Sequence, residues 1–188
     1  QDRSGLIWIG TIGGLVRFSA DFRGAALPTA AIIGNGVCFS PDDRFLYFSD
    51  SRGRAIYRYP KEAEQLGPRE RLVALDVHPG RPDGCTVDAE GCLWSARVGG
   101  GRIDRYLPDG RLIDTLELPV SCPTHCTFGG PDLRTMFVTT AHIAADEAPT
   151  SDRALVGAVL AYDMDVAGLP EHRVRTPHTR AGGGGTRL

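Results

Sequence analysis

The chain has 188 residues, of which 41% are hydrophobic and 23% are charged, and its formal net charge at pH 7 is -2. This balance is typical of a globular domain, and it excludes the basic footprint of a nucleic-acid-binding protein and an extended acidic tail. No apolar run approaches the roughly 20 residues needed to span a bilayer, so neither nucleic acid nor a membrane is expected as a partner.

Short apolar runs, each preceded by a turn rich in Gly, Pro or Asp, predict β-strands along the chain. In chain order these runs are Leu6–Ile9, Phe45–Phe48, Cys92–Trp94 and Thr135–Val138. Each run is followed by a second strand pattern, at Gly14–Phe18, Ala55–Tyr59, Gly101–Tyr106 and Gly157–Tyr162. No segment sustains the 3.6-residue period of an amphipathic helix, so the predicted class is all-β.

The predicted strands repeat. Residues 2–8 and 88–94 share one Asp-x-x-Gly-x-x-Trp pattern, and the aromatic residues at positions 8, 47, 94 and 137 are 39, 47 and 43 residues apart. A period of roughly 40 to 50 residues with several short strands in each unit predicts the blades of a β-propeller, of which about four are visible. Closed propellers of four blades exist, so the count alone leaves open whether the ring is complete.

The chain has five cysteines, an odd number, and it has no Cys-x-x-Cys pair. Both features argue against a disulfide framework and against a zinc knuckle. We therefore expect five free thiols in a reducing compartment, mostly filling small core positions. They are Cys38, Cys85, Cys92, Cys122 and Cys126.

Three stretches resemble motifs of one family, the SMP-30/gluconolactonase/luciferin-regenerating-enzyme-like proteins. Gly34–Asp42 is similar to its NG-xx-xSPD motif, Arg81–Trp94 to PDG-xxxD-xEG-xLW, and Leu118–Leu133 to LPV-xxPT-xxxFGGPD. The order and spacing agree from residue 2 to about residue 170. The resemblance implies a six-bladed propeller, with this chain as its C-terminal two-thirds: residues 1–175 form a partial propeller, and the Gly-rich tail 176–188 is expected to be disordered.

The resemblance also implies a divalent cation on the propeller axis, held in the family by a Glu, an Asn and an Asp. The Asn of the first motif is Asn35 here, and the Asp of the second is Asp83. The Glu and an Arg-x-Asn-Asp-Gly substrate motif would precede residue 1, so we expect the chain to begin downstream of both. The amide oxygen of Asn35 and the carboxylate oxygens of Asp83 suit Ca²⁺, Mg²⁺ or Mn²⁺ and also accept Zn²⁺ or Fe²⁺. Asn35 and Asp83 each precede a Gly, which predicts a tight turn that directs the side chain toward the axis. The alternative is that both are turns without any role in a site.

Other polar residues are weaker candidates. Thr124 and His125 come just before the Phe-Gly-Gly stretch, where the family places cavity-lining residues, so they are candidates for substrate binding. A turn is favoured for Asp50 and Ser51, and a solvated loop position for His78. Four further carboxylates are predicted to form turns rather than to act in catalysis: Asp42, Asp88, Asp109 and Asp132.

The resemblance implies metal-dependent hydrolysis of a small sugar lactone, with Asp83 as metal ligand and proton acceptor. No Gly-x-Ser-x-Gly nucleophile motif is present to suggest a serine hydrolase. Two alternatives stay open: a non-enzymatic, metal-binding propeller with a calcium-related or interaction role, and a different propeller chemistry such as an arylesterase. A cytoplasmic location is expected, and the oligomeric state is left open.

Overall fold

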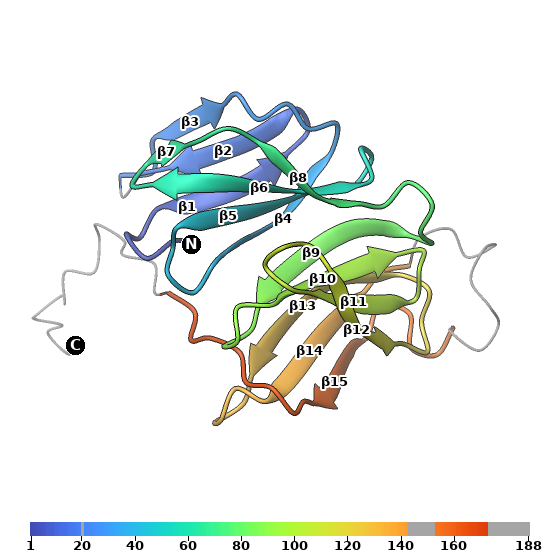
Figure 1. Cartoon of the computed structure of the whole chain (residues 1–188). Coiled ribbons are helices and arrows are strands. Elements are labelled where there is room, and N and C mark those ends of the chain that lie inside the picture. Colours follow the sequence, from blue (N-terminus) through green and yellow to red (C-terminus); the bar gives the residue numbers. More distant parts are fainter. Residues whose placement is uncertain (20, 143–152, 173–188) are drawn as a thin grey trace, which may run out of the picture.

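The computed structural model describes residues 1–19, 21–142 and 153–172 (Figure 1). Within these residues the backbone forms fifteen strands and no helix, so the predicted all-β class is confirmed. The strands group into four antiparallel sheets, arranged like neighbouring propeller blades. No helix among the described residues is long and apolar enough to cross a membrane. The domain boundary expected at residue 175 and the tail 176–188 lie outside the described residues.

The sheets follow one another along the chain. The first contains β1 (Ile7–Thr11), β2 (Gly14–Phe18) and β3 (Gly24–Leu27). The second contains β4 (Gly34–Phe39), β5 (Phe45–Asp50), β6 (Ala55–Glu62), β7 (Gln65–Leu66) and β8 (Glu70–Ala74), with β7 and β8 both paired to β6. The third contains β9 (Arg81–Val87), β10 (Leu93–Val98), β11 (Arg102–Tyr106) and β12 (Leu112–Glu117). The fourth contains β13 (Pro123–Gly129), β14 (Thr135–Thr140) and β15 (Val159–Asp163).

All eight strands predicted from apolar runs are present, as β1, β5, β10 and β14 and their partners β2, β6, β11 and β15. The sequence did not predict the outer strands β3, β8 and β12, which are short and largely exposed. It also did not predict that β4, β9 and β13 are strands, because Gly34–Gly36 and Pro82–Gly84 have turn composition and β13 begins with Pro123. Their pairing nevertheless makes them full members of the sheets.

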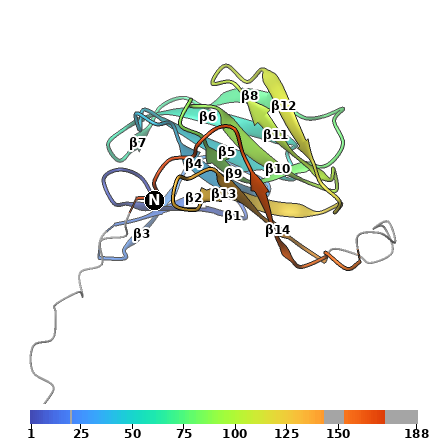
Figure 2. The ribbon, with the colours of Figure 1, turned by 90° about the horizontal axis from the view of Figure 1, so that it is seen from below.

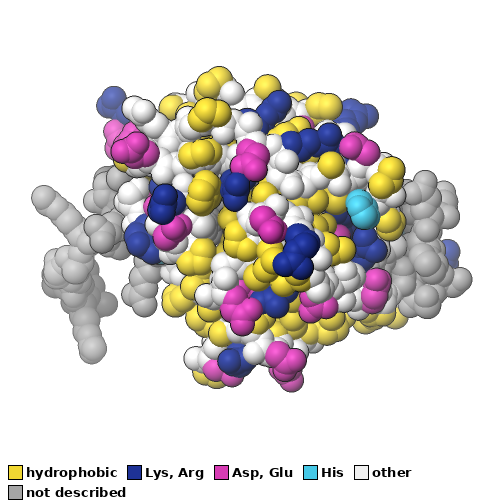
Figure 3. Space-filling model, viewed as in Figure 1, with side chains coloured by type: hydrophobic (Ala, Val, Ile, Leu, Met, Phe, Trp, Pro, Cys, Tyr) yellow, Lys and Arg dark blue, Asp and Glu magenta, His cyan; other side chains and the backbone are white. Residues whose placement is uncertain are grey.

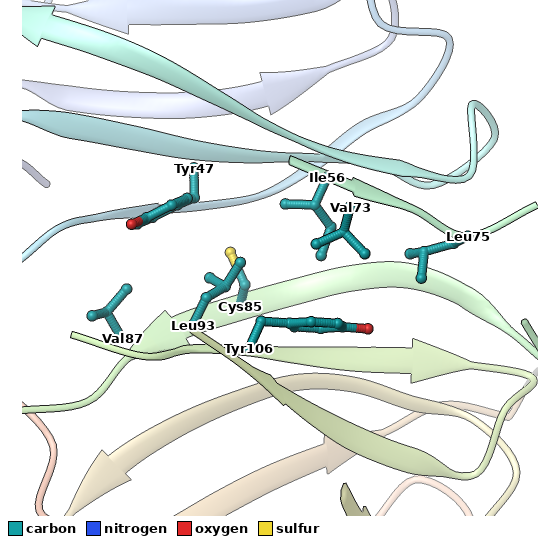
Figure 4. Close-up of a cluster of buried hydrophobic side chains, with 8 residues drawn as sticks. All are labelled: Tyr47, Ile56, Val73, Leu75, Cys85, Val87, Leu93 and Tyr106. Carbon is teal, nitrogen blue, oxygen red and sulfur yellow. The ribbon is translucent and has the colours of Figure 1, made fainter. Parts of the chain in front are cut away.

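Each hydrophobic core lies between two successive sheets, as the packing of propeller blades requires. Leu46 and Phe48 of β5 join the core shared with the first sheet, whereas Tyr47 between them joins the core shared with the third. This alternation follows from the two-residue period of a strand. Figure 4 shows the second core, where Tyr47 and Ile56 face Leu93 and Tyr106 across the interface. The third core, centred on Trp94 and Met136, joins the third and fourth sheets.

The repeated Asp-x-x-Gly-x-x-Trp pattern forms a repeated hydrogen-bond network. Asp88 is fully buried and accepts hydrogen bonds from Trp94 Nε1 at 2.8 Å and from the Cys92 amide at 2.9 Å. Asp2 accepts the same pair of bonds from Trp8 Nε1 at 2.9 Å and from the Leu6 amide at 3.0 Å. Each Asp thus fixes the turn that leads into a strand. The prediction that Asp88 forms a turn is confirmed, although it is buried.

On the face of the molecule shown in Figure 3, acidic and basic side chains are interspersed, and no large area carries charges of one sign.

Strands β4, β9 and β13 lie beside one another, and each is the first strand of its sheet. Strand β4 packs on β9, and β9 packs on β13 (Figure 2). Residues 35, 83 and 124 are far apart in sequence, but this arrangement brings the strands that carry them together.

Candidate functional site

Each of the three adjacent first strands has a β-bulge where a predicted site residue lies. In β4, residues 35 and 36 fall between the pairs Gly34–Asp50 and Val37–Phe48. In β9, residues 83 and 84 fall between the pairs of Pro82 and Cys85, and in β13 Thr124 is the extra residue. Bulges redirect side chains and are frequent beside active sites. The predicted tight turns at positions 35 and 83 are therefore wrong, because both residues lie inside strands.

Glycine follows each of the two predicted metal ligands for a reason of packing. A Cβ on Gly36 would collide with the carbonyl oxygen of Asp83, and a Cβ on Gly84 would collide with the ring of His125. Neither glycine has a positive φ. These glycines are thus needed for the close approach of neighbouring strands and not for turn geometry. The close approach brings the three bulges to one end of the strands.

Asn35 and Asp83 line the same cavity, which has a volume of about 190 Å³. Asp83 is half-buried and Asn35 is exposed. The remaining lining comes from the β5–β6 turn, from the open end of the β9–β10 hairpin, where Arg81 pairs with Val98, and from the segment before β4: Ile33, Ser51, Arg52, Arg81 and Val98. The two residues that the family motifs single out therefore meet in one site, 48 residues apart in sequence.

A short chain of hydrogen bonds orients the Asn35 amide. Asn35 Nδ2 donates to Ser51 Oγ at 3.2 Å, and Ser51 Oγ donates to the carbonyl oxygen of Pro82 at 2.7 Å. The Asn35 side chain also hydrogen-bonds the Asp83 carboxylate. No described residue donates a hydrogen bond to Asn35 Oδ1. That oxygen is free to serve as a ligand.

Burial raises the pKa of Asp83 from its usual value near 3.8 to about 6, despite the opposing effects of the Asn35 hydrogen bond and the positive charge of Arg81. No described Lys or Arg forms an ion pair with this carboxylate. A half-buried carboxylate without an ion-pair partner is an electrostatic cost that a bound cation would remove.

The residues present fit a divalent cation in ligand chemistry. A carboxylate and an amide oxygen are hard donors of the kind that Ca²⁺ and Mg²⁺ prefer. Over the described ranges, no group of three or more His, Cys, Asp or Glu side chains is placed to hold a metal. The fit therefore rests on the Asp83 carboxylate and on the amide oxygen of Asn35, and Asn is not among those four residue types.

Thr124 and His125 lie in β13, beside the site rather than in its lining. The Thr124 hydroxyl shares a hydrogen bond of 2.8 Å with the Thr139 hydroxyl. His125 stacks against Gly84 and lines a second cavity, of about 710 Å³, with residues of β4 and β9. Burial lowers the pKa of His125, although the negative charge of Glu171 opposes this effect. Their role in substrate binding stays a prediction.

The weaker candidates are placed as turn and loop residues. The Asp50 carboxylate accepts hydrogen bonds from the amides of Ile32, Ile33 and Gly53, so its predicted turn role is confirmed. His78 is exposed in the loop before β9 and does not line the cavity of Asn35 and Asp83. The side chains of Asp42, Asp109 and Asp132 each accept a hydrogen bond from a backbone amide two residues on, as predicted for turn carboxylates.

Sequence reasoning missed Arg52 and Arg81 as residues of the site. For Ser51 a turn was favoured over a place in the cavity, yet Ser51 lines the cavity and its hydroxyl links Asn35 to the β9 backbone. Arg81 directly precedes the Pro-Asp-Gly motif, and its position there was the available signal. Arg52 has no motif of its own, so only the folded structure brings it to the cavity.

The chain matches the family model of the SMP-30/Gluconolactonase/LRE-like region over residues 2–142. It is 37% identical over 180 residues to the 6-deoxy-6-sulfogluconolactonase of Pseudomonas putida, a match that covers 90% of this chain and 62% of that protein. It is 35% identical over 184 residues to a pentonolactonase of Haloferax volcanii, covering 92% of this chain and 63% of that one. The chain thus spans less than two-thirds of the length of these relatives.

A similar solved structure is that of a calcium-binding protein, regucalcin, from Agrobacterium tumefaciens. It superposes with a TM-score of 0.80 at 31% identity, and the match covers 89% of this chain and 60% of that one. A luciferin-regenerating enzyme superposes with a TM-score of 0.77 at 28% identity, covering 89% and 61%. Both likenesses agree with the propeller architecture.

Proposed function

The chain belongs to the SMP-30/gluconolactonase/LRE-like family, and on that basis we propose that it hydrolyses a sugar lactone with the help of one divalent cation. Two relatives that share more than a third of its residues are named as lactonases of sugar acids. The observation that carries the proposal is the meeting of Asn35 and Asp83 in one cavity, from bulges on two neighbouring strands. A cytoplasmic location remains a prediction of the sequence.

Asp83 and Asn35 would hold the cation through a carboxylate oxygen and Oδ1. When bound there, a divalent cation supplies Lewis-acid polarisation of the lactone carbonyl. The Asp83 carboxylate takes the proton of the attacking water, and it holds that proton at an oxygen that faces the cavity. The ring oxygen leaves as an alcohol and takes up a proton, which completes the hydrolysis. Ser51 holds the Asn35 amide through Nδ2, so Oδ1 is left without a hydrogen-bond donor among the described residues.

We expect the protein, expressed from its complete reading frame, to release protons from five- and six-membered sugar lactones faster than spontaneous hydrolysis. EDTA should reduce the rate to the background, and one ion among Ca²⁺, Zn²⁺, Mg²⁺, Mn²⁺ and Fe²⁺ should restore it. EDTA already saturated with calcium is the matched control. Turnover that persists in EDTA would remove the cation from the mechanism. A bound cation without turnover on any lactone would favour the non-enzymatic propeller.

A further inference from the structure

Two guanidinium groups line the cavity of Asn35 and Asp83 without a protein partner of their own. Arg52 lies in the turn between β5 and β6, and Arg81 is the first residue of β9, so they approach from two neighbouring sheets. Both are exposed, and neither side chain makes a hydrogen bond or an ion pair within the described residues. Asp83 is the one acidic side chain in the described lining.

Several other arginines of the described chain form ion pairs. Arg58 pairs with Glu70 at 2.7 Å, Arg71 with Asp76 at 2.7 Å, and Arg105 with the buried Asp88 at 2.7 Å. Arg52 and Arg81 form no such ion pair, and both line the one cavity that also contains Asn35 and Asp83. A guanidinium presents paired N–H donors that match a carboxylate, sulfonate or phosphate.

We propose that the substrate is a lactone that carries an anionic substituent, held by Arg52 and Arg81. This inference rests on the proposed lactonase function and deepens it. Asp83 faces the carbonyl end of the lactone, so Arg52 and Arg81 are available to bind the substituents on the rest of the ring. A neutral lactone leaves both guanidiniums without a partner, so the site favours the charged substrate by interactions that the neutral one lacks.

The test compares the aldono-1,4-lactone and the aldaro-1,4-lactone of one sugar, which differ only in CH₂OH or carboxylate at C6. We expect a kcat/KM about tenfold higher for the charged lactone at low salt, and a smaller ratio at high salt because the guanidiniums are exposed. Arg52→Gln with Arg81→Gln should reduce the ratio toward one. Arg111→Gln, an exposed arginine at the turn before β12, is the matched control and should leave the ratio unchanged.

Equilibrium binding separates this inference from the function itself. By calorimetry, the open-chain aldarate dianion should bind about tenfold more tightly than the aldonate, and the double variant should lose that difference. Equal kcat/KM for both lactones in an active protein would overturn the anionic substrate and leave the lactonase function standing. If no lactone turns over, equal affinity for the two acids would overturn the inference independently. A preference that survives the double variant would overturn the role of these arginines.

A second and independent observation concerns two thiols on β4 and β9, the strands that carry Asn35 and Asp83. Cys38 Sγ of β4 and Cys85 Sγ of β9 are 3.2 Å apart. Cys85 is 3% exposed, Cys38 is half-buried, and all five cysteines are free in the structure. Figure 4 shows the Cys85 sulfur pointing toward the second sheet. The thiols belong to neighbouring sheets, so a bond between them would join two blades.

We infer that Cys38 and Cys85 form a reversible disulfide when a low-molecular-weight disulfide is present as oxidant. The cavity of about 710 Å³ borders both residues and gives the oxidant access. The Cys38 thiolate attacks the oxidant and expels one thiol, and the Cys85 thiolate then attacks the mixed disulfide and expels the second. Two electrons pass from the cysteines to the oxidant, and their two protons pass to the released thiols.

Burial raises the pKa of the Cys38 thiol, and the neighbouring Cys85 adds to this effect. Because the thiolate is the nucleophile, formation of the bond should be slow near neutral pH and faster in mild alkali. The bond would hold β4 and β9 at a fixed spacing close to Asn35 and Asp83. It would also cross-link the unfolded chain across 47 positions.

Incubation of the protein with oxidised glutathione, followed by non-reducing mass spectrometry, tests the bond. We expect a loss of two hydrogen atoms and a cross-link between tryptic peptide 24–44, which contains Cys38, and peptide 72–97. That second peptide also contains Cys92, so fragmentation must place the bond at Cys85. The thermal midpoint should rise by about 5 °C and fall back on reduction. Cys122→Ala should keep the effect, and Cys38→Ala should abolish it. Stable glutathionylation without the cross-link, or a cross-link at Cys92, would overturn the inference.

Discussion

Replacing Asp83 by Ala is expected to reduce kcat/KM for lactone hydrolysis by at least about 10³-fold, because the side chain is both the proposed cation ligand and the proposed proton acceptor. Asp83→Asn should lose almost as much, since the amide keeps the shape and removes the charge. The measurement is initial-rate proton release together with calorimetric titration of the cation. Cation affinity should fall at least about tenfold in either variant.

The stability of these variants separates a functional carboxylate from a structural one. In the cation-free protein the folded state raises the pKa of Asp83 to about 6, above its unfolded value. The folded state therefore disfavours the charged form, and the stability contributed by the protonated group is lost as pH rises through about 6. At pH 7 without a cation, Asp83→Asn should melt at or above the temperature of the parent protein. An excess of the cation should reverse that order.

The matched control is Asp114→Ala, which removes an exposed carboxylate from the outer strand β12. Its kcat/KM and its cation affinity should equal those of the parent protein. Near-parental turnover in Asp83→Ala would contradict the proposed site directly. A large loss of stability in the same variant, with or without cation, would instead assign Asp83 a structural role.

How far the sequence predicts this fold depends on the strand. The apolar runs that became β5 and β10 are buried on both faces, so composition alone identifies them. Strand β4 begins with Gly34-Asn35-Gly36, and β9 has Pro82-Asp83-Gly84 directly after its first residue; the composition of both stretches is typical of turns. Asn-Gly and Asp-Gly serve turns and bulges equally well, and the difference depends on a neighbouring strand that local sequence does not contain.

The sequence likewise marked only some of the residues of the candidate site. The family resemblance placed the motif residues Asn35 and Asp83 on a common axis, and both line one cavity, while their role as cation ligands stays a prediction. The contributions of Ser51 and Arg52 come from the β5–β6 turn, and no motif marks them. The Cys38–Cys85 proximity likewise arises only when two sheets pack, since 46 residues separate the thiols in sequence.

The largest expected loss of stability is at Asp88. This carboxylate is fully buried, and it accepts hydrogen bonds from Trp94 Nε1, from the amides of Glu90 and Cys92, and from the Arg105 guanidinium at 2.7 and 2.9 Å. Asp88→Ala should lower the free energy of unfolding by about 3–5 kcal/mol, because it leaves buried donors unpaired and removes the buried one of the two carboxylates that pair with Arg105. Chemical denaturation followed by Trp fluorescence measures the change.

Asp88→Asn separates the two causes. The amide oxygen still accepts from Trp94 Nε1 or the Cys92 amide, but the ion pair with Arg105 is lost, so a loss of about 1.5–3 kcal/mol is expected. Asp132→Ala is the matched control: this exposed turn carboxylate accepts one backbone amide, from Arg134, and its removal should cost less than about 1 kcal/mol. Equal losses of stability at positions 88 and 132 would contradict the anchoring role of Asp88.

Asp88 follows β9 directly, at the end opposite to the bulge of Asp83. One end of this strand is therefore built for stability, while the other carries an unpaired carboxylate at a cost to stability, and the two variants should move stability in opposite directions.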